Sequence, residues 1–157
     1  MNDADVVQRI AELGLELPAA PIPVAAYVPV RSSGSIAFVA GQVAIVDGVV
    51  QHPGLLGRDV SVEDGQAAGR RASLQALAAL REALGSFERL RGILQVTVYI
   101  ACTPEFAEHP VVANGASQLL VDVLGEPGKH ARAAVGMASL PLGGSVEVAV
   151  TAEIDPA

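Results

Sequence analysis

The longest helix-forming stretch of the chain begins at Ser61 and ends before Gly85. Ser61 can cap the first turn, and Asp64 stands three residues later, close to the pattern of a capping box. The many alanines between favour helix and permit close packing, and glycine is typical of a helix end. One face of this helix carries Ser73, Leu77, Leu80 and Leu84, and another carries Arg71, Gln75 and Glu82.

Two later stretches, 94–102 and 146–154, alternate between apolar and polar residues as half-buried strands do. The side chains expected to face the core are Leu94, Val96, Val98, Ile100 and Cys102 in the first stretch and Val146, Val148, Val150, Ala152 and Ile154 in the second. The opposite face carries Gln95, Thr97, Tyr99, Glu147 and Thr151. That face is semi-polar, so it must meet water or another subunit.

Weaker signals complete the chain. They predict a helix at 4–13, a proline-rich connector at 17–23, a hairpin with strands at 25–30 and 36–40 around a loop at 31–35, a second hairpin at 43–50 turning at Asp47-Gly48, a loop at 51–60, a helix at 110–124 and a strand at 129–135. We therefore expect one α+β domain over 1–157, with an N-terminal helix and connector at 1–21 and a core at 22–157. Two long helices can cover only one face of its sheet.

Composition limits the classes of function. The chain has 157 residues, of which 51 % are hydrophobic and 17 % charged, which is typical of a globular domain with some surface in subunit contacts. Its net charge is −7 and only 3 % of its residues are aromatic. Nucleic-acid binding usually needs a basic patch and stacking aromatics, so no nucleic-acid partner is expected.

The same sequence predicts a cytoplasmic protein without a membrane partner. A single cysteine, Cys102, excludes an intrachain disulfide framework and fits a reducing compartment. Acidic and polar residues occupy the place of a positively charged signal-peptide start, and no apolar run approaches the roughly 20 residues that span a bilayer. As the end of an apolar alternation, Cys102 is expected to be a small core residue rather than a nucleophile.

Several common catalytic motifs are absent from the sequence. It contains no P-loop, no dinucleotide-type glycine pattern and no nucleophile elbow. The three histidines have no metal-ligand spacing, so no metal site is expected. The remaining candidates are Arg132, flanked by small residues, and Glu147, set in a row of valines, which we expect on adjacent strands.

Two interpretations of Arg132 and Glu147 are open. They can form a buried or interfacial ion pair, or never meet at all. Alternatively they serve a substrate, because a guanidinium grips a carboxylate through two hydrogen bonds and a glutamate can orient or deprotonate water. Such a substrate would be small, with a carboxylate at one end and an electrophilic carbon at the other.

A set of short motifs, in this order and spacing, resembles the YjgF/RidA family, whose fold is chorismate-mutase-like. The motifs are Tyr27, Phe38-Val39-Ala40-Gly41-Gln42, the alanine-rich helix, Val96-Thr97-Val98-Tyr99-Ile100, Asn114, Arg132, Leu140-Pro141 and Val146-Glu147-Val148. The resemblance covers roughly residues 22–155, and the N-terminal helix is similar to that of a longer branch of the family.

This resemblance implies a homotrimer with a mixed sheet, two long helices on one face, and clefts between subunits. It also implies hydrolysis of reactive 2-imino acids, or their enamine tautomers, to 2-oxo acids and ammonia without a cofactor. Arg132 would bind the carboxylate, Glu147 would hold the attacking water, Tyr27 would line the pocket and Asn114 would support the site.

The chain departs from the family pattern at two positions. A serine usually precedes Gly41, where this chain has Ala40, and a cysteine usually stands two residues after the arginine, where it has Ala134. Each lost hydrogen bond is worth about 0.5–1.5 kcal/mol, so these changes can shift the substrate without abolishing activity. His130 shares a strand side with Arg132 by the period of two and can reshape the pocket or sit at the strand edge.

Two other functions compete with the deaminase. A trimer could hold a small carboxylate metabolite without turning it over, which Ala40 and Ala134 favour. The family's ribonuclease labels suggest RNA cleavage, which the acidic charge disfavours.

Overall fold

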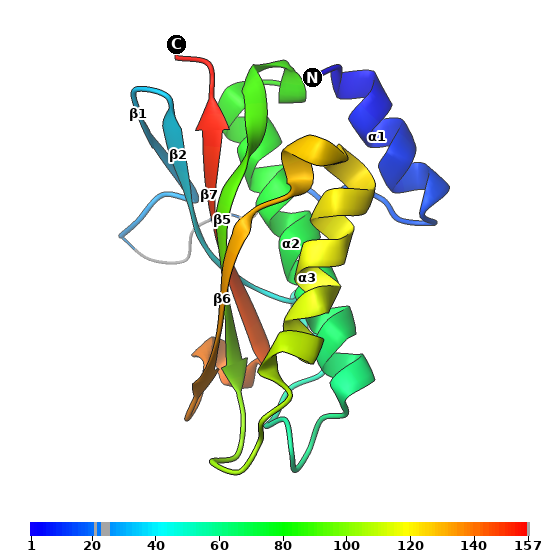
Figure 1. Ribbon diagram of the computed structural model, residues 1–157, viewed down its shortest axis with the longest axis vertical. Helices are drawn as coiled ribbons and strands as arrows, with labels where there is room; N and C mark the ends of the chain where they lie inside the picture. Colours follow the sequence, from blue (N-terminus) through cyan, green and yellow to red (C-terminus); the bar gives the residue numbers. More distant parts are fainter. Residues whose placement is uncertain (21, 23–25, 157) are drawn as a thin grey trace.

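The computed structural model describes residues 1–20, 22 and 26–156 (Figure 1). Its main sheet has five strands in the order β1-β2-β7-β5-β6, namely β1 (Val30–Ser33), β2 (Ile36–Val43), β7 (Val146–Ile154), β5 (Leu90–Ala101) and β6 (Ala131–Met137). β6 runs parallel to β5, and the other neighbours are antiparallel. The predicted mixed α+β architecture is therefore confirmed.

Two long helices, α2 (Val62–Leu84) and α3 (His109–Leu124), lie side by side against one face of this sheet (Figure 1). Ser61 Oγ accepts a hydrogen bond from the Asp64 amide at 3.0 Å, and Gly85 ends α2 with a left-handed φ of 80°, as predicted. α3 approaches closely because Gly115 has no side chain: a Cβ there would lie 2.1 Å from the carbonyl oxygen of Gln66.

The expected alternation is confirmed throughout β7, where every second residue from Val146 to Ile154 is buried. In β5 it is correct from Val96 to Ile100 but wrong at Leu94, which is 42 % exposed. The pairing register with β7 shifts between Ile93 and Gln95, and this bulge turns Ile93 instead of Leu94 into the core. Cys102, just past the strand, is partly buried against the core.

The predicted first hairpin needs correction. Residue 25 lies outside the described part of the chain, and residues 26–29 are not a strand. Instead, β1 occupies the stretch expected as a loop, because Gly34 (φ 56°) turns the chain tightly enough for Arg31–Ser33 to pair with β2. The second hairpin is confirmed: β3 (Ile45–Val46) and β4 (Val49–Val50) flank Asp47 and Gly48, which both have positive φ.

The N-terminal helix α1 (Asp3–Glu12) packs Val6 and Ile10 into the core. Asp3 accepts hydrogen bonds from the guanidinium of Arg81 at 2.8 and 3.0 Å and from the Phe87 amide at 2.9 Å. This anchor ties α1 to the end of α2.

The remaining short helices are η1 (Phe87–Arg89), η2 (Glu126–Gly128) and η3 (Pro141–Gly143). None of the described helices is long and apolar enough to cross a membrane.

Candidate functional site

The candidate site lies at a bulge in β2, whose residues Ala40 and Gly41 line it. The register with β7 shifts between Val39 and Gln42, so two residues of β2, Ala40 and Gly41, stand opposite the single residue Ala149 of β7. The Ala40 amide instead donates to the carbonyl of Pro29 at 2.8 Å, which brings the segment after Tyr27 against the bulge. The sheet is thereby opened next to Glu147 of β7.

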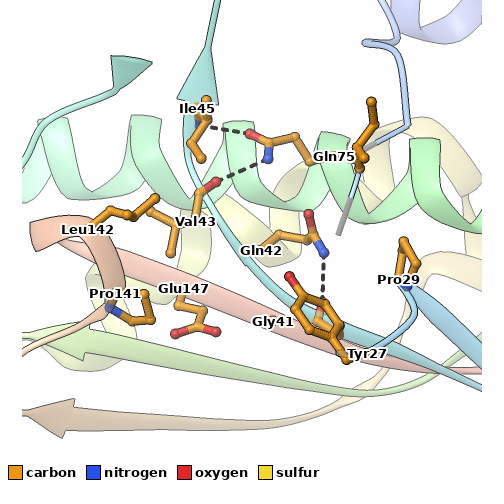
Figure 2. A pocket seen from close by; sticks show the side chains of 12 residues that line it. Tyr27, Pro29, Gly41, Gln42, Val43, Ile45, Gln75, Pro141, Leu142 and Glu147 are labelled. Atoms are coloured by element: carbon orange, nitrogen blue, oxygen red, sulfur yellow. Dashed lines mark hydrogen bonds between the residues drawn. The ribbon is translucent and has the colours of Figure 1, made fainter. Parts of the chain in front are cut away.

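A cavity of about 440 Å³ lies at this opening (Figure 2). Four of the predicted site residues line it, namely Tyr27, Ala40, Gly41 and Glu147. Sequence reasoning missed much of the rest of the wall, which includes Pro29, Val43, Ile45, Gln75, Pro141 and Leu142. No local pattern marks these residues, because they come from four separate segments of the chain.

Glu147 is the acidic group of the cavity. Its side chain projects from β7 beside Val43, its partner in the sheet register (Figure 2). None of the hydrogen bonds among the described residues involves its carboxylate, and burial raises its pKa above the ordinary glutamate value. A half-buried carboxylate with these properties is suited to accept a proton from water.

Gly41 leaves the space that this carboxylate occupies. A Cβ at position 41 would lie 1.9 Å from Glu147 Oε1 and 2.8 Å from Cδ, which is a steric overlap. The absence of a side chain at Gly41 thus determines where the carboxylate can sit.

We expect Gly41→Ala to lower kcat/KM for the reaction proposed below by about tenfold or more, because a displacement of about 1 Å can cost as much as 100-fold. The unfolding midpoint should change little, since the flexible Glu147 side chain can rotate away. Steady-state kinetics and thermal denaturation measure the two effects. In a Glu147→Ala background the same substitution should have no further effect on rate, and a further loss there would contradict the steric coupling.

Gln75 of α2 supports the cavity from behind. Its Oε1 accepts from the Ile45 amide at 2.8 Å, and its Nε2 donates to the Val43 carbonyl at 3.0 Å. Arg71, one helical turn earlier, donates through Nε to the Ile45 carbonyl at 2.9 Å. Two residues of the helix face expected to be polar, Arg71 and Gln75, therefore fix the end of β2 and the start of β3, and Gln75 itself is only 7 % exposed.

A second cluster surrounds Arg132 on β6. Arg132 Nη1 donates to Asn114 Oδ1 at 2.9 Å and to Ser117 Oγ at 3.1 Å, and Nη2 donates to the Pro110 carbonyl at 3.3 Å. These three contacts with α3 hold the guanidinium in one orientation. Ala134, two residues later on the same side of β6, packs against the core.

His130 extends this cluster through Ser117. Its Nε2 lies 2.9 Å from Ser117 Oγ, and its Nδ1 lies 2.6 Å from the Gly128 carbonyl. Burial lowers the pKa of His130, the Gly128 contact opposes this, and the Arg132 charge lowers it further. A neutral ring that donates from Nδ1 and accepts at Nε2 fits these contacts. His130 and Arg132 thus share one side, as predicted, and both use Ser117, which the sequence did not single out.

The expected placement of Arg132 and Glu147 on adjacent strands is wrong. β5 lies between β6 and β7, and it aligns Arg132 with Val96 but Glu147 with Tyr99. Val96 is buried against the helices, and Arg132 lies on the same face, where it donates to Asn114 of α3. Tyr99 and Glu147 lie on the opposite face of the sheet. The two groups therefore do not form an ion pair within one chain. Among the described residues, no cluster of three or more His, Cys, Asp or Glu could hold a metal ion.

Comparisons with known proteins agree with this architecture. A curated relative, Protein TCP17 of Trypanosoma cruzi, is 40 % identical over 151 residues, which are 96 % of this chain and 94 % of that protein. The solved structure of Atu1372 from Agrobacterium tumefaciens, titled as having unknown function, is 44 % identical with a TM-score of 0.92, covering 98 % of this chain and 94 % of that one.

A protein from Shewanella oneidensis MR-1, titled "a putative endoribonuclease", is 33 % identical with a TM-score of 0.91, covering 95 % of this chain and 99 % of the other. Escherichia coli TdcF, solved with bound serine, shares the fold at 23 % identity and a TM-score of 0.61, over 85 % of this chain and 92 % of that one. The family model described as "YjgF/chorismate_mutase-like, putative endoribonuclease" matches residues 7–154. The chain therefore belongs to the YjgF/chorismate-mutase-like family.

Proposed function

We propose that this protein hydrolyses 2-imino acids, or their enamine tautomers, to 2-oxo acids and ammonia without a cofactor. The observation that carries the proposal is the Glu147 carboxylate, which lies half-buried in a cavity with no hydrogen bond from the described residues and a raised pKa. Such a group is available to activate a water molecule at an electrophilic carbon.

The proposed reaction uses only groups of the polypeptide. Water attacks the iminium carbon while Glu147 accepts one of its protons, and a C–O bond replaces the C=N π bond. The returned proton makes the carbinolamine nitrogen a leaving group. The C–N bond then breaks as the C=O bond forms, and the hydroxyl proton passes to the released ammonia, giving the 2-oxo acid and ammonium. The iminium is electrophilic already, so the protein needs to bind the carboxylate and orient the water.

Arg132 is the group that would bind the substrate carboxylate, and we propose that it does so across a subunit interface. Within one chain Arg132 and Glu147 belong to opposite faces of the sheet. The face without helices also exposes large apolar side chains, including Phe38 at 54 %, Val135 at 40 % and Met137 at 38 %. A homotrimer, as the family resemblance implies, would cover these side chains and bring Arg132 of one subunit to the cavity of the next.

Activity is tested by generating 2-iminopropanoate with an amino-acid oxidase and measuring its loss by semicarbazide trapping. We expect the wild type to shorten the lifetime of the imino acid and to release ammonia in equal amount. Unchanged lifetimes for several imino acids would refute the deaminase. If 2-oxo acids then still raised the melting temperature, the clefts would bind small carboxylates without turnover.

The shared site can be tested by mixing two inactive variants. Arg132→Ala and Glu147→Gln subunits, co-expressed in equal amounts, should regain about a quarter of wild-type activity, because random assembly unites two intact groups at one cleft in four. The separately purified variants, mixed without subunit exchange, provide the control. A mixed assembly as inactive as either variant would refute a cleft shared between subunits.

TdcF, which has this fold, is titled as holding serine, an amino acid with a carboxylate. That title supports a ligand of amino-acid size.

The endoribonuclease wording of the family description has less support from this chain. Its net charge is −7, and the guanidiniums of Arg58, Arg81 and Arg91 are each paired with an aspartate.

A further inference from the structure

The cavity beside Glu147 is larger and more apolar than a small imino acid requires. Its volume within one chain is about 440 Å³, in the range of pockets that enclose ligands much larger than 2-iminopropanoate. Apolar side chains form most of its wall, namely Ile22, Pro29, Val43, Ile45, Pro141 and Leu142.

The glutamines in this wall are largely occupied by the protein itself. Gln75 uses both its amide oxygen and its amide nitrogen on the backbone of Ile45 and Val43. Gln42 donates its amide nitrogen to the Ala40 carbonyl at 2.9 Å. Within one chain, the polar side-chain atoms left for a ligand are the Glu147 carboxylate, the Tyr27 hydroxyl and the Gln42 carbonyl oxygen (Figure 2). Under the proposed function, Arg132 of the next subunit adds only the contact with the substrate carboxylate. Ala40 adds no hydroxyl, so a polar substrate side chain would meet few partners.

Leu142 indicates what occupies the apolar part. It has a left-handed φ of 58°, a conformation that leucine rarely adopts, and its side chain is 72 % exposed. The surrounding loop nevertheless packs tightly on the cavity wall, since a Cβ on Gly144 would lie 2.5 Å from Val43 Cγ1. Leu142 thus contributes little to the core of the chain but presents an apolar surface beside Val43 and Ile45 (Figure 2).

We infer that the cavity selects 2-imino acids with a bulky apolar side chain, such as those formed by oxidation of leucine or phenylalanine. The imino carbon lies at Glu147, and the side chain rests on Val43, Ile45 and Leu142. This inference rests on the proposed function for the reaction, but the preference for an apolar side chain follows from the cavity wall. Transfer of the extra carbon atoms from water to this wall favours the larger substrate.

The preference is tested by comparing kcat/KM for the imino acids generated from leucine and from alanine, which share the same reacting end. We expect the leucine-derived substrate to be favoured about tenfold or more, from three additional buried carbons. Leu142→Asn should reduce this ratio about fivefold, because asparagine tolerates the left-handed backbone but removes the apolar contact. Val49→Asn, which removes an exposed apolar side chain from β4 outside the cavity wall, is the matched control and should keep the ratio.

Melting temperatures provide a readout that does not require catalysis. At equal concentration, 4-methyl-2-oxopentanoate should stabilise the wild type more than pyruvate does, and Leu142→Asn should reduce the difference. Equal efficiency toward both imino acids would overturn the preference and leave the deaminase intact. Stabilisation by the larger oxo acid without any hydrolysis would overturn the deaminase and support the preference.

Discussion

Arg132→Ala should lower kcat/KM for 2-imino acids by about 100- to 1000-fold. In the proposed cleft between subunits the charge pair of Arg132 and the substrate carboxylate would be desolvated, and loss of one partner from such a pair costs about 3–4 kcal/mol. Asn114, Ser117 and the Pro110 carbonyl already hold the guanidinium in place, so carboxylate binding should cost little side-chain entropy of Arg132. Steady-state kinetics on the leucine- and alanine-derived imino acids would measure the loss for both substrates.

Two controls separate this effect from loss of charge or fold. Arg132→Lys retains the positive charge but not the planar fork, so it should recover only part of the activity. Arg58→Ala removes another arginine, whose ion pair with Asp59 lies on the surface, and should leave the rate unchanged. The melting temperature of Arg132→Ala should stay near that of the wild type, since the side chain is exposed. Wild-type kinetics in Arg132→Ala would remove Arg132 from the site.

Glu147→Gln should lower kcat by about 100- to 1000-fold, with a smaller change in KM. Glutamine keeps the shape and the capacity to hydrogen-bond water but cannot accept its proton. Single-turnover rates, with KM measured in parallel, would distinguish this loss from weaker binding. A change confined to KM would assign Glu147 to substrate binding instead of proton transfer.

The raised pKa of Glu147 predicts a pH dependence for both activity and stability. Activity should fall as the pH drops through a value above that of an ordinary glutamate, and this limb should be absent in the residual rate of Glu147→Gln. The folded state binds this proton more tightly than the unfolded chain does. Wild-type stability relative to Glu147→Gln should therefore be greatest below the unfolded pKa and decline as the pH rises through the folded pKa. Chemical denaturation at several pH values measures this difference.

Local patterns were sufficient for most of the fold. The cap at Ser61, the left-handed end at Gly85 and the alternation of β7 each depend on interactions between near neighbours, and the structure contains all three. The alternation wrongly predicts that Leu94 is buried, because the bulge at this point depends on the pairing register with β7, which the sequence of β5 alone does not determine. The polar composition of Arg31–Ser33 predicts a loop, but these residues form a strand because their backbone pairs with β2.

The candidate site was predictable only in part, because it depends on the order of strands in the sheet. The sequence and its family resemblance singled out Glu147, Gly41 and Arg132, but their separation follows from β5 lying between β6 and β7. The roles of Ser117 and Gln75 could not be predicted, because they depend on contacts with distant segments: Arg132 for Ser117, and Val43 and Ile45 for Gln75. The periodicity of a helix shows that such a residue is on a polar face but not what it contacts.

The placement of Arg132 and Glu147 on opposite faces of the sheet has a consequence for control of the proposed activity. Under that proposal a folded chain alone carries two half-sites and no complete one, so catalysis would begin only upon association. Specific activity would then rise steeply with protein concentration and vanish on sufficient dilution, although every chain remained folded. The amount of enzyme in a cell would thereby determine the fraction that is active as well as the total.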